Sequence, residues 1–489
     1  MTFRAKTSLL KKCHYNSFMK QDSISKKAFK AGTWYTISNF LLKGVGFITT
    51  PIFTRLLTKG EYGEYSNYTA WLSIIAILVT LEMSGCVYRA RYDYEDDFDG
   101  FLSSIIACGS LITLICYLIV CLFMPFFVKI FDMDAIYIHF MFFNVLLSPA
   151  LTIMQAKHRI LQKYKSFVAV SVGSTIVSTL VSLAGVYFCK DRLFGRIAGM
   201  TIPLLIVYLA AYIMMMARGK KFYVGEYWKY AVGISLPLVP HLLSNTILGS
   251  SDRIMIKQMC SAQDAAVYSV AYSCGMIISI LFTSLNQAWE PWLFDRVHNK
   301  DNESVKKMSR FYLLFFVVLV MGCILVAPEL IWFMGGKAYY EAVYVIPPVM
   351  AGYGCKFAYT FYVNMERFEK QTKYISIGTL ISAAVNVILN FIFIPIFGYM
   401  AAAYTTLFGF ILLLVLHYVM SKKLGLTDMY DNRFVFLMTA VMVVGGIALG
   451  GLYLLPAYAR WIIIVLIGVV TAFMGLKFYK RIKRKDSSS

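Results

Sequence analysis

The stretch HLLSNTILGSSDRIMIKQM (residues 241–259) decides between a soluble fold and a membrane fold. It is mostly apolar and follows GISLPLVP, so together the two segments have the length of a helix that crosses a membrane. The same stretch carries His241, Asp252 and Arg253. A charged side chain at the centre of a membrane helix costs at least about 2.5 kcal/mol. Either these groups face protein or water, or the stretch is not a membrane helix.

The composition of the chain excludes the soluble alternative. Hydrophobic residues make up 59% of the 489 residues and charged residues only 15%, whereas an ordinary globular protein is about 45–50% apolar. Apolar windows of about 20 residues, each long enough to cross roughly 30 Å of hydrocarbon, recur along the whole chain. The sequence therefore predicts an all-α, polytopic membrane protein.

Counting these windows predicts about fourteen transmembrane helices joined by short connections, with no room for a soluble domain. The predicted spans are 31–54, 65–87, 101–128, 135–156, 166–188, 194–217, 229–252, 265–290, 309–328, 340–364, 374–396, 399–419, 434–455 and 460–478.

The net charge of +21 is distributed very unevenly between the two sides of the predicted membrane. One side carries 35 of the 47 Lys and Arg residues and the other carries 10, while Lys43 and Lys356 lie inside spans. The basic side is cytoplasmic by the positive-inside rule, which places both termini in the cytoplasm. The basic runs are then topology determinants beside anionic lipids, and no nucleic-acid partner is expected. Residues 1–30 have no apolar core, so we expect no cleavable signal peptide.

The sequence contains none of the motifs that indicate an enzyme. A phosphate-binding G-x-x-x-x-G-K-[ST] loop, an H-E-x-x-H motif and a nucleophile elbow are all missing. The ten cysteines form no C-x-x-C pair, so neither a metal site nor a disulfide framework is expected. Ionisable residues inside the spans are spread singly over several helices, which suits a transport pathway better than a reaction centre. We therefore expect no catalytic residue and no bound cofactor.

An internal repeat divides the chain into two halves. The segment KHRILQKYKSFVAVSV (157–172) resembles MERFEKQTKYISIGTL (365–380), and the turn FGRIAGMT (194–201) resembles FGYMAAAYTT (397–406). The matched segments run in the same direction, which predicts a pseudo-twofold axis along the membrane normal. The expected organisation is a basic N-terminus, two six-helix lobes, a pair of further helices and a basic tail, at 1–30, 31–217, 218–420, 421–478 and 479–489.

The first helix of each half carries a similar pair of polar groups. TRLLTKGEYGEYSNY (54–68) parallels DRIMIKQMCSAQDAAVYSVAY (252–272), which aligns Arg55 with Arg253. Lys43 and His241 each lie twelve residues earlier, about 18 Å along a helix. Each half thus has one cationic or protonatable group near mid-membrane and one arginine near the outer end. These groups either line a central cavity or, for Asp252 and Arg253, simply pair with each other.

A second correspondence involves acidic residues. EMSGCVYR (82–89) matches EPWLFDR (290–296), so that Glu82 and Glu290 each lie near the inner end of the second helix and precede an arginine. Glu82, His241, Asp252 and Glu290 are the candidates for ion coupling.

The chain resembles the polysaccharide biosynthesis flippases, the Wzx-type O-antigen and capsule oligosaccharide translocases of the multidrug/oligosaccharidyl-lipid/polysaccharide (MOP) exporter superfamily. The resemblance rests on the two halves and on LPLVPHLLSNTILGSSDRIMI…AAVYSVAY and ERFEKQTKYISIGTLISAAVNVILN. It implies the bilobed fold of MATE drug exporters and the lipid II flippase, with alternating access around a cation-lined central cavity. The implied cargo is an undecaprenyl-pyrophosphate-linked oligosaccharide, moved from the cytoplasmic to the outer face of the bacterial plasma membrane.

The same resemblance implies a proton or sodium gradient as energy source, and membrane lipids, a polysaccharide polymerase and glycosyltransferases as partners. A lipid diphosphate is strongly anionic and binds Lys and Arg through charge-assisted hydrogen bonds. The residues expected to contact it are the cavity cations Lys43, Arg55, Arg89, Arg253 and Lys356. Two alternatives stay open: a lipid II-type or sporulation-type flippase, and a MATE-like antiporter, whose cationic drugs would call for acidic cavity residues.

Overall fold

The computed structural model describes residue 34, residues 37–38, residues 40–466 and residue 468. Within these residues every regular element is helical, as the sequence predicts. The chain divides into two compact units, and the division falls between Ser250 and Ser251, inside a helix. The lobe boundaries placed by the repeat at 217/218 and 420/421 remain predictions.

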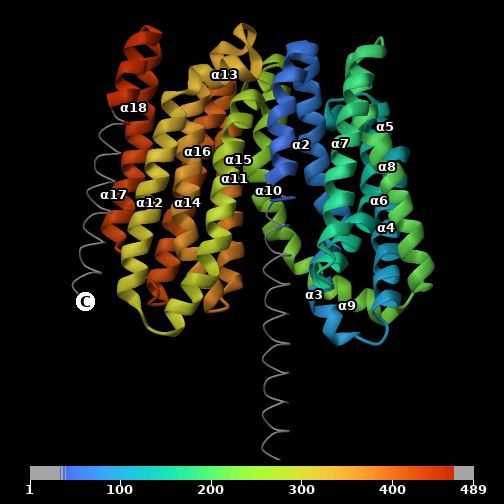
Figure 1. Cartoon of the computed structure of the whole chain (residues 1–489). Coiled ribbons are helices and arrows are strands. Elements are labelled where there is room, and N and C mark those ends of the chain that lie inside the picture. The colour runs from blue at the N-terminus through green and yellow to red at the C-terminus, as the bar shows by residue number, and fades with distance from the viewer. Residues whose placement is uncertain (1–33, 35–36, 39, 467, 469–489) are drawn as a thin grey trace, which may run out of the picture. The chain divides into compact units, whose positions relative to one another are not determined.

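Unit 1 is a bundle in which the long helices α2, α4, α6, α7 and α8 run alongside one another (Figure 1). Residues 40–56 are also helical and precede α2. The labelled elements are α2 (Lys59–Thr80), η1 (Met83–Cys86), α3 (Val87–Asp93), α4 (Phe98–Leu122), α5 (Met124–Phe131), α6 (Ala135–Ile160), α7 (Tyr164–Phe188), α8 (Arg192–Gly219), α9 (Gly225–Ser235), η2 (Leu236–Leu238) and α10 (Val239–Met259), the last of which continues into unit 2.

A capping box begins α2, and two residues with left-handed backbone end it. Thr58 caps its start, since its hydroxyl accepts from the Glu61 backbone N–H at 3.2 Å while the Glu61 carboxylate accepts from the Thr58 N–H at 2.7 Å. At the other end Leu81 and Glu82 adopt left-handed φ values of 51° and 45°. The chain then continues as η1 and α3 at an angle of 53° to α2. The predicted span 65–87 is therefore broken at Leu81–Glu82.

Glycines allow α7 and α8 to pack with their backbones in contact. A Cβ atom on Gly195 would lie only 2.2 Å from the carbonyl oxygen of Gly185, and one on Gly199 would lie 2.5 Å from the Cα of Ser182. Small residues at a helix interface permit this close approach. Inside a membrane, helices gain no hydrophobic driving force for association, and close packing of this kind holds them together instead. The FGRIAGMT repeat segment therefore serves helix packing in this unit.

Unit 2 is built around α14, most of whose residues are buried against α11, α12 and α16. Its elements are α11 (Ala262–His298), α12 (Asn302–Leu325), α13 (Ala327–Gly335), η3 (Lys337–Val345), α14 (Ile346–Phe368), α15 (Thr372–Phe397), α16 (Tyr399–Lys423), α17 (Asn432–Ala440), η4 (Val441–Gly445), α18 (Gly446–Gly450) and η5 (Gly451–Leu454). A short apolar helix, Ala457–Leu466, follows.

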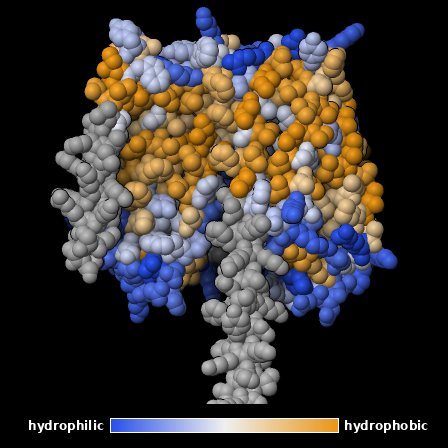
Figure 2. All heavy atoms as spheres, in the orientation of Figure 1, coloured by the Kyte–Doolittle hydropathy of each residue, from blue (hydrophilic) through white to orange (hydrophobic). Residues whose placement is uncertain are grey.

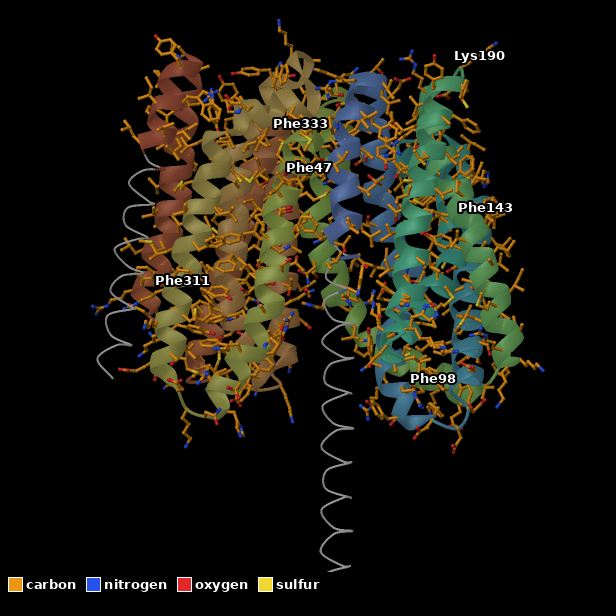
Figure 3. All side chains as sticks on the ribbon, viewed as in Figure 1. Phe47, Phe98, Phe143, Lys190, Phe311 and Phe333 are labelled. Carbon is orange, nitrogen blue, oxygen red and sulfur yellow. The ribbon has the colours of Figure 1, made fainter. Side chains whose placement is uncertain are left out.

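Most described residues of the fourteen predicted windows are helical, but windows 65–87, 101–128 and 309–328 each contain a break between helices. Ten helices are long and apolar enough to cross a membrane, or eleven if α2 with η1–α3 counts as one bent span. On the visible face, hydrophobic side chains cover the middle of each unit and hydrophilic ones lie at the two ends (Figure 2). Phe143 of α6 and Phe311 of α12 are 44% and 49% exposed and point away from their helices, while Lys190 lies at the α7–α8 turn (Figure 3). Apolar side chains exposed at this level are those expected of a surface in contact with lipid. The protein is a multi-pass membrane protein.

Candidate functional site

The most highly connected polar group in unit 2 is the carboxylate of Asp252, which is 1% exposed. It accepts hydrogen bonds from Asn390 Nδ2 of α15 and Thr406 Oγ1 of α16, both at 2.7 Å, and from the hydroxyl of Tyr268 in α11. Thr405 donates in turn to the Asn390 side-chain oxygen. We call Asp252, Tyr268, Asn386, Asn390, Thr405 and Thr406 the Asp252 cluster. It joins α10, α11, α15 and α16.

Asp252 and Arg253 form no ion pair with each other, so the interpretation that these two neighbours simply pair with each other is wrong. The donors to the Asp252 carboxylate are two hydroxyls and one amide, all neutral. The Arg253 guanidinium lies instead over the ring of Tyr272, with 5.2 Å between its central carbon and the ring centroid, and its Nε atom has no hydrogen-bond partner. The buried carboxylate is thus satisfied by hydrogen bonds without an ion pair.

The Asp252 cluster brings together oxygen atoms suited to a small hard cation or to a proton. Asn386 Nδ2 donates to Thr406 Oγ1 at 3.1 Å, and its own side-chain oxygen is buried without a hydrogen-bond partner. Carboxylate, carboxamide and hydroxyl oxygens are the ligands that hard cations prefer. A single buried carboxylate also gains a neutral state by binding one proton. These oxygen atoms therefore suit a monovalent cation or a proton.

Unit 1 contains a buried cluster of the opposite charge. The guanidinium of Arg196 in α8 lies 3.5 Å from the ring centroid of Phe53 and 4.2 Å from that of Tyr65. It donates to Ser182 Oγ at 2.6 Å and to the Tyr65 hydroxyl at 2.9 Å. In the part of the chain that the structure describes, Arg196 forms no ion pair with a carboxylate. It is a buried cation held by aromatic rings and hydroxyls.

The two clusters share one corresponding position of the repeat. The offset that aligns Lys165 with Lys373 also aligns Ser182 with Asn390. Both residues are buried and polar, but Ser182 accepts from the guanidinium of Arg196, whereas Asn390 donates to the carboxylate of Asp252.

The two mid-span lysines are both half-buried. Lys43 lies in the helical segment 40–56. The Lys356 ammonium lies 5.4 Å from the centroid of the Phe410 ring of α16, and Gly352, one turn earlier in α14, leaves room for that ring. A cation over an aromatic face is attracted by the negative charge of the ring face.

The remaining predicted cations lie at the ends of helices. Arg55 is exposed and donates to the Pro51 carbonyl at 2.6 Å. Arg89 is exposed in α3 and pairs with Asp93 at 3.3 Å. Such an exposed pair, one helical turn apart, contributes little to stability.

The other three ion-coupling candidates have different surroundings. Glu82 lies in the break after α2 and accepts from Ser84 Oγ at 2.9 Å. Glu290 lies within the continuous helix α11 and pairs with Arg367 at 3.5 Å, so the two matched glutamates differ in backbone structure. The His241 ring in α10 is 3.3 Å from Asn245 Nδ2. None of the three is fully buried as Asp252 is.

Comparison with known proteins identifies the family of this chain. The family model described as polysaccharide biosynthesis protein matches residues 28–297, which is more than half of the 489 residues. The chain belongs to this polysaccharide biosynthesis family.

Relatives and solved structures agree with this membership. A protein of the Lsg locus of Haemophilus influenzae is 25% identical over 425 residues, covering 82% of this chain and all of the relative. The inward-closed structure of the lipid II flippase MurJ matches with a TM-score of 0.68 at 15% identity, over 91% of this chain and 98% of MurJ. An inward-facing multidrug resistance MATE transporter of the MOP superfamily matches with a TM-score of 0.58 at 11% identity, over 81% and 95% of the two chains. At these identities the structures show that the chain shares its fold with these proteins, as the resemblance implies.

Sequence reasoning missed two buried clusters of this polysaccharide biosynthesis protein. Arg196 lies in FGRIAGMT, which was interpreted only as a repeated turn, whereas the structure buries this arginine in α8. The second cluster consists of Glu366, His417 and Ser421, which are all fully buried in unit 2. His417 Nδ1 lies 2.8 Å from Glu366 Oε2, and Ser421 Oγ donates to Glu366 Oε1 at 3.1 Å. The only sequence signal for it is a histidine inside the apolar run LLLVLHYVM.

Proposed function

We propose that this protein is a flippase that moves an undecaprenyl-pyrophosphate-linked oligosaccharide from the cytoplasmic to the outer face of the bacterial plasma membrane by alternating access. The observation that carries the proposal is the match to the polysaccharide biosynthesis family, on a fold shared with a lipid flippase over 91% of the chain. A membrane-embedded member of a polysaccharide pathway must act on an intermediate that is itself in the membrane. A lipid-linked oligosaccharide is that intermediate.

The sign of the charges within the spans supports an anionic head group. Lys43 and Lys356 are half-buried at mid-span, and Arg196 is buried without a carboxylate partner among the described residues. Asp252, a fully buried acid of unit 2, already accepts hydrogen bonds from three donors. A diphosphate binds ammonium and guanidinium groups through short charge-assisted hydrogen bonds. A cationic drug would instead require acidic groups free to receive it.

The Asp252 cluster is the proposed ion-coupling site. Asp252, Asn386, Asn390 and Thr406 would hold a sodium ion or a proton, which would neutralise the buried carboxylate. The cluster links α10 to α15 and α16 through side-chain hydrogen bonds, so its charge state affects how firmly these helices are held together. Ion binding is coupled to the helix arrangement if the ion binds more tightly to one arrangement of these helices than to another.

Replacing Lys356 tests the proposal. Lys356→Met keeps most of the volume and removes the charge, whereas Lys356→Arg keeps the charge. If the ammonium binds the diphosphate, the Met and Ala variants should insert normally yet fail to export, so that glycan-lipid accumulates facing the cytoplasm. Losing one charge-assisted contact of about 1.5–3 kcal/mol lowers affinity roughly 10- to 150-fold.

The assay measures glycan exposed at the cell surface in a deletion strain, at equal protein level. The matched control is Lys423→Met, which removes an exposed lysine at the end of α16. The Arg variant should keep part of the activity. Full export by Lys356→Met would show that this lysine serves packing rather than cargo binding.

A further inference from the structure

The Glu366, His417 and Ser421 cluster has no part in the function proposed so far. Glu366 lies near the end of α14 and His417 near the end of α16, and neither side chain has any exposed surface. His417 is eleven residues after Thr406 on α16, which is about 16 Å along the helix. The cluster is therefore distinct from the Asp252 cluster.

The hydrogen bonds of the cluster leave one atom unused. Glu366 receives one bond from Ser421 and one from His417 Nδ1, so both carboxylate oxygens have a partner. His417 Nε2, in contrast, is buried without a hydrogen-bond partner. The ring of Tyr359 lies beside the imidazole, with 5.5 Å between the centroids, and offers that nitrogen an aromatic neighbour instead of an acceptor.

One proton decides the net charge of this buried pair. With a neutral imidazole that donates from Nδ1, the pair carries the full negative charge of the carboxylate. With one proton more, on Nε2 or on the carboxylate, the net charge is zero. Taking an uncompensated charge out of water costs several kcal/mol, so the charge of a fully enclosed pair is tightly linked to the packing around it.

The packing around His417 Nε2 is supplied by α15. A Cβ atom on Gly378 would lie 2.8 Å from Nε2, so the backbone of α15 covers the unused nitrogen directly. Any residue larger than glycine would push the imidazole or the helix away. Movement of α15 away from α16 at this point would uncover Nε2.

The charged groups on the surrounding elements are paired or exposed. Arg367, next to Glu366, pairs with Glu290 of α11, and Arg310 of α12 pairs with Asp431 before α17. Other charged residues on the packed helices are half-buried or exposed: Lys356, Lys373, Lys422 and Lys423. None of these is within ion-pair distance of Glu366 or His417 in the described residues.

We propose that Glu366 and His417 form a one-proton exchange site that α15 closes at Gly378. A proton enters or leaves through Nε2 when α15 separates from α16, and it is retained when the two helices are packed. Since this end of the helices is cytoplasmic by the charge distribution of the loops, the site exchanges with the cytoplasm. The movement of α15 and the charge of the pair are thereby coupled.

Protonation can be measured without cargo, so a failure here is separate from a failure of the flippase proposal. Full-length protein in lipid nanodiscs is titrated over about pH 5–8, the range in which histidine sites exchange protons, and the carbonyl stretch of protonated carboxylic acids is followed by infrared difference spectroscopy. We expect a titrating band that is absent in Glu366→Gln and shifted in pH midpoint in His417→Gln. Glu369→Gln, an exposed acid one turn away, is the matched control and should keep the band.

A second measurement keeps the test decisive if Glu366→Gln does not fold. In ¹⁵N-histidine-labelled protein, the His417 signal is the one that is missing from His417→Gln but present in the exposed-site control His298→Gln. This signal should change with pH. Gly378→Ala should alter the pH dependence of the His417 signal. An infrared band unaffected by Glu366→Gln, or a His417 signal that stays constant over the whole range, would overturn the proposal.

Discussion

Two substitutions of Asp252 separate its charge from its hydrogen bonds. Asp252→Leu leaves Tyr268, Asn390 and Thr406 facing an apolar side chain. Each buried donor left without an acceptor costs about 1–3 kcal/mol. Because the hydroxyls can rotate toward other acceptors, we expect a total loss of about 3 kcal/mol, which is roughly 6–12 °C in the midpoint of thermal unfolding for a unit of this size.

Asp252→Asn removes the charge but keeps most of the bonds. Its side-chain oxygen can still accept from Asn390, and its amide can donate to the two hydroxyls. We expect a loss of less than about 1.5 kcal/mol. The wild-type protein should gain stability when choline is replaced by sodium at constant ionic strength, or when the pH is lowered. At a cation concentration 100 times Kd this gain is about 2.7 kcal/mol, and the Asn variant should lack it.

The assay is thermal unfolding of purified protein in nanodiscs, with Asp428→Asn as the control because Asp428 is exposed. The control should respond to cations as the wild type does. A Leu variant as stable as the wild type would refute the role of Asp252 as an anchor. An Asn variant with the same cation response would refute its role as the coupling site.

Three further predictions concern other parts of the chain. Replacing both Arg55 and Arg253 with Ala should lower export more than the two single changes combined; a double variant with wild-type export at equal protein level would leave them only a structural role. Reporters fused after residues 165, 229, 310 and 485 should read cytoplasmic and those within 253–263 and 335–341 external; two inverted signals would refute the fourteen-span topology. Arg310 donates to Asp431, and this hydrogen bond lowers the pKa of that carboxyl below its usual value. The stabilisation by this half-exposed pair, at most about 1 kcal/mol, is therefore present above about pH 4 and lost as the pH falls through the lowered pKa. Thermal unfolding of Asp431→Asn should differ from wild type at pH 7, and the difference should shrink as the pH is lowered below about 4; a difference that does not depend on pH would contradict the pairing.

The helices were predictable from sequence because each membrane window carries its own signal. An apolar run of about 20 residues has one stable solution in lipid, a helix with its backbone bonds made internally. Most described residues of the predicted windows are accordingly helical. The break at Leu81–Glu82 was not predictable, since neither residue is a glycine, the usual sequence signal for a left-handed backbone.

The candidate site was predictable only in part, because burial of a polar residue depends on partners far along the chain. Asp252 was recognised as an ionisable group at membrane depth, but its partners Asn390 and Thr406 lie more than 130 residues away. Arg253 next to it suggested an ion pair that the helix geometry does not form. Arg196 and His417 stood in segments read as a turn and as plain apolar sequence, and only the packing of α7 on α8 and of α14 on α16 reveals them.

Translocation by the purified protein tests the central claim most directly. The protein is reconstituted into liposomes that carry a fluorescent undecaprenyl-pyrophosphate oligosaccharide in both leaflets, and a membrane-impermeant quencher or glycosidase reports how fast the inner pool becomes accessible. Lipid II and a cationic dye serve as alternative cargoes. We predict rapid, complete accessibility of the oligosaccharide lipid with the wild-type protein, and slow partial accessibility with Lys356→Met. Accessibility no faster than in protein-free liposomes, together with transport of the cationic dye, would contradict the account.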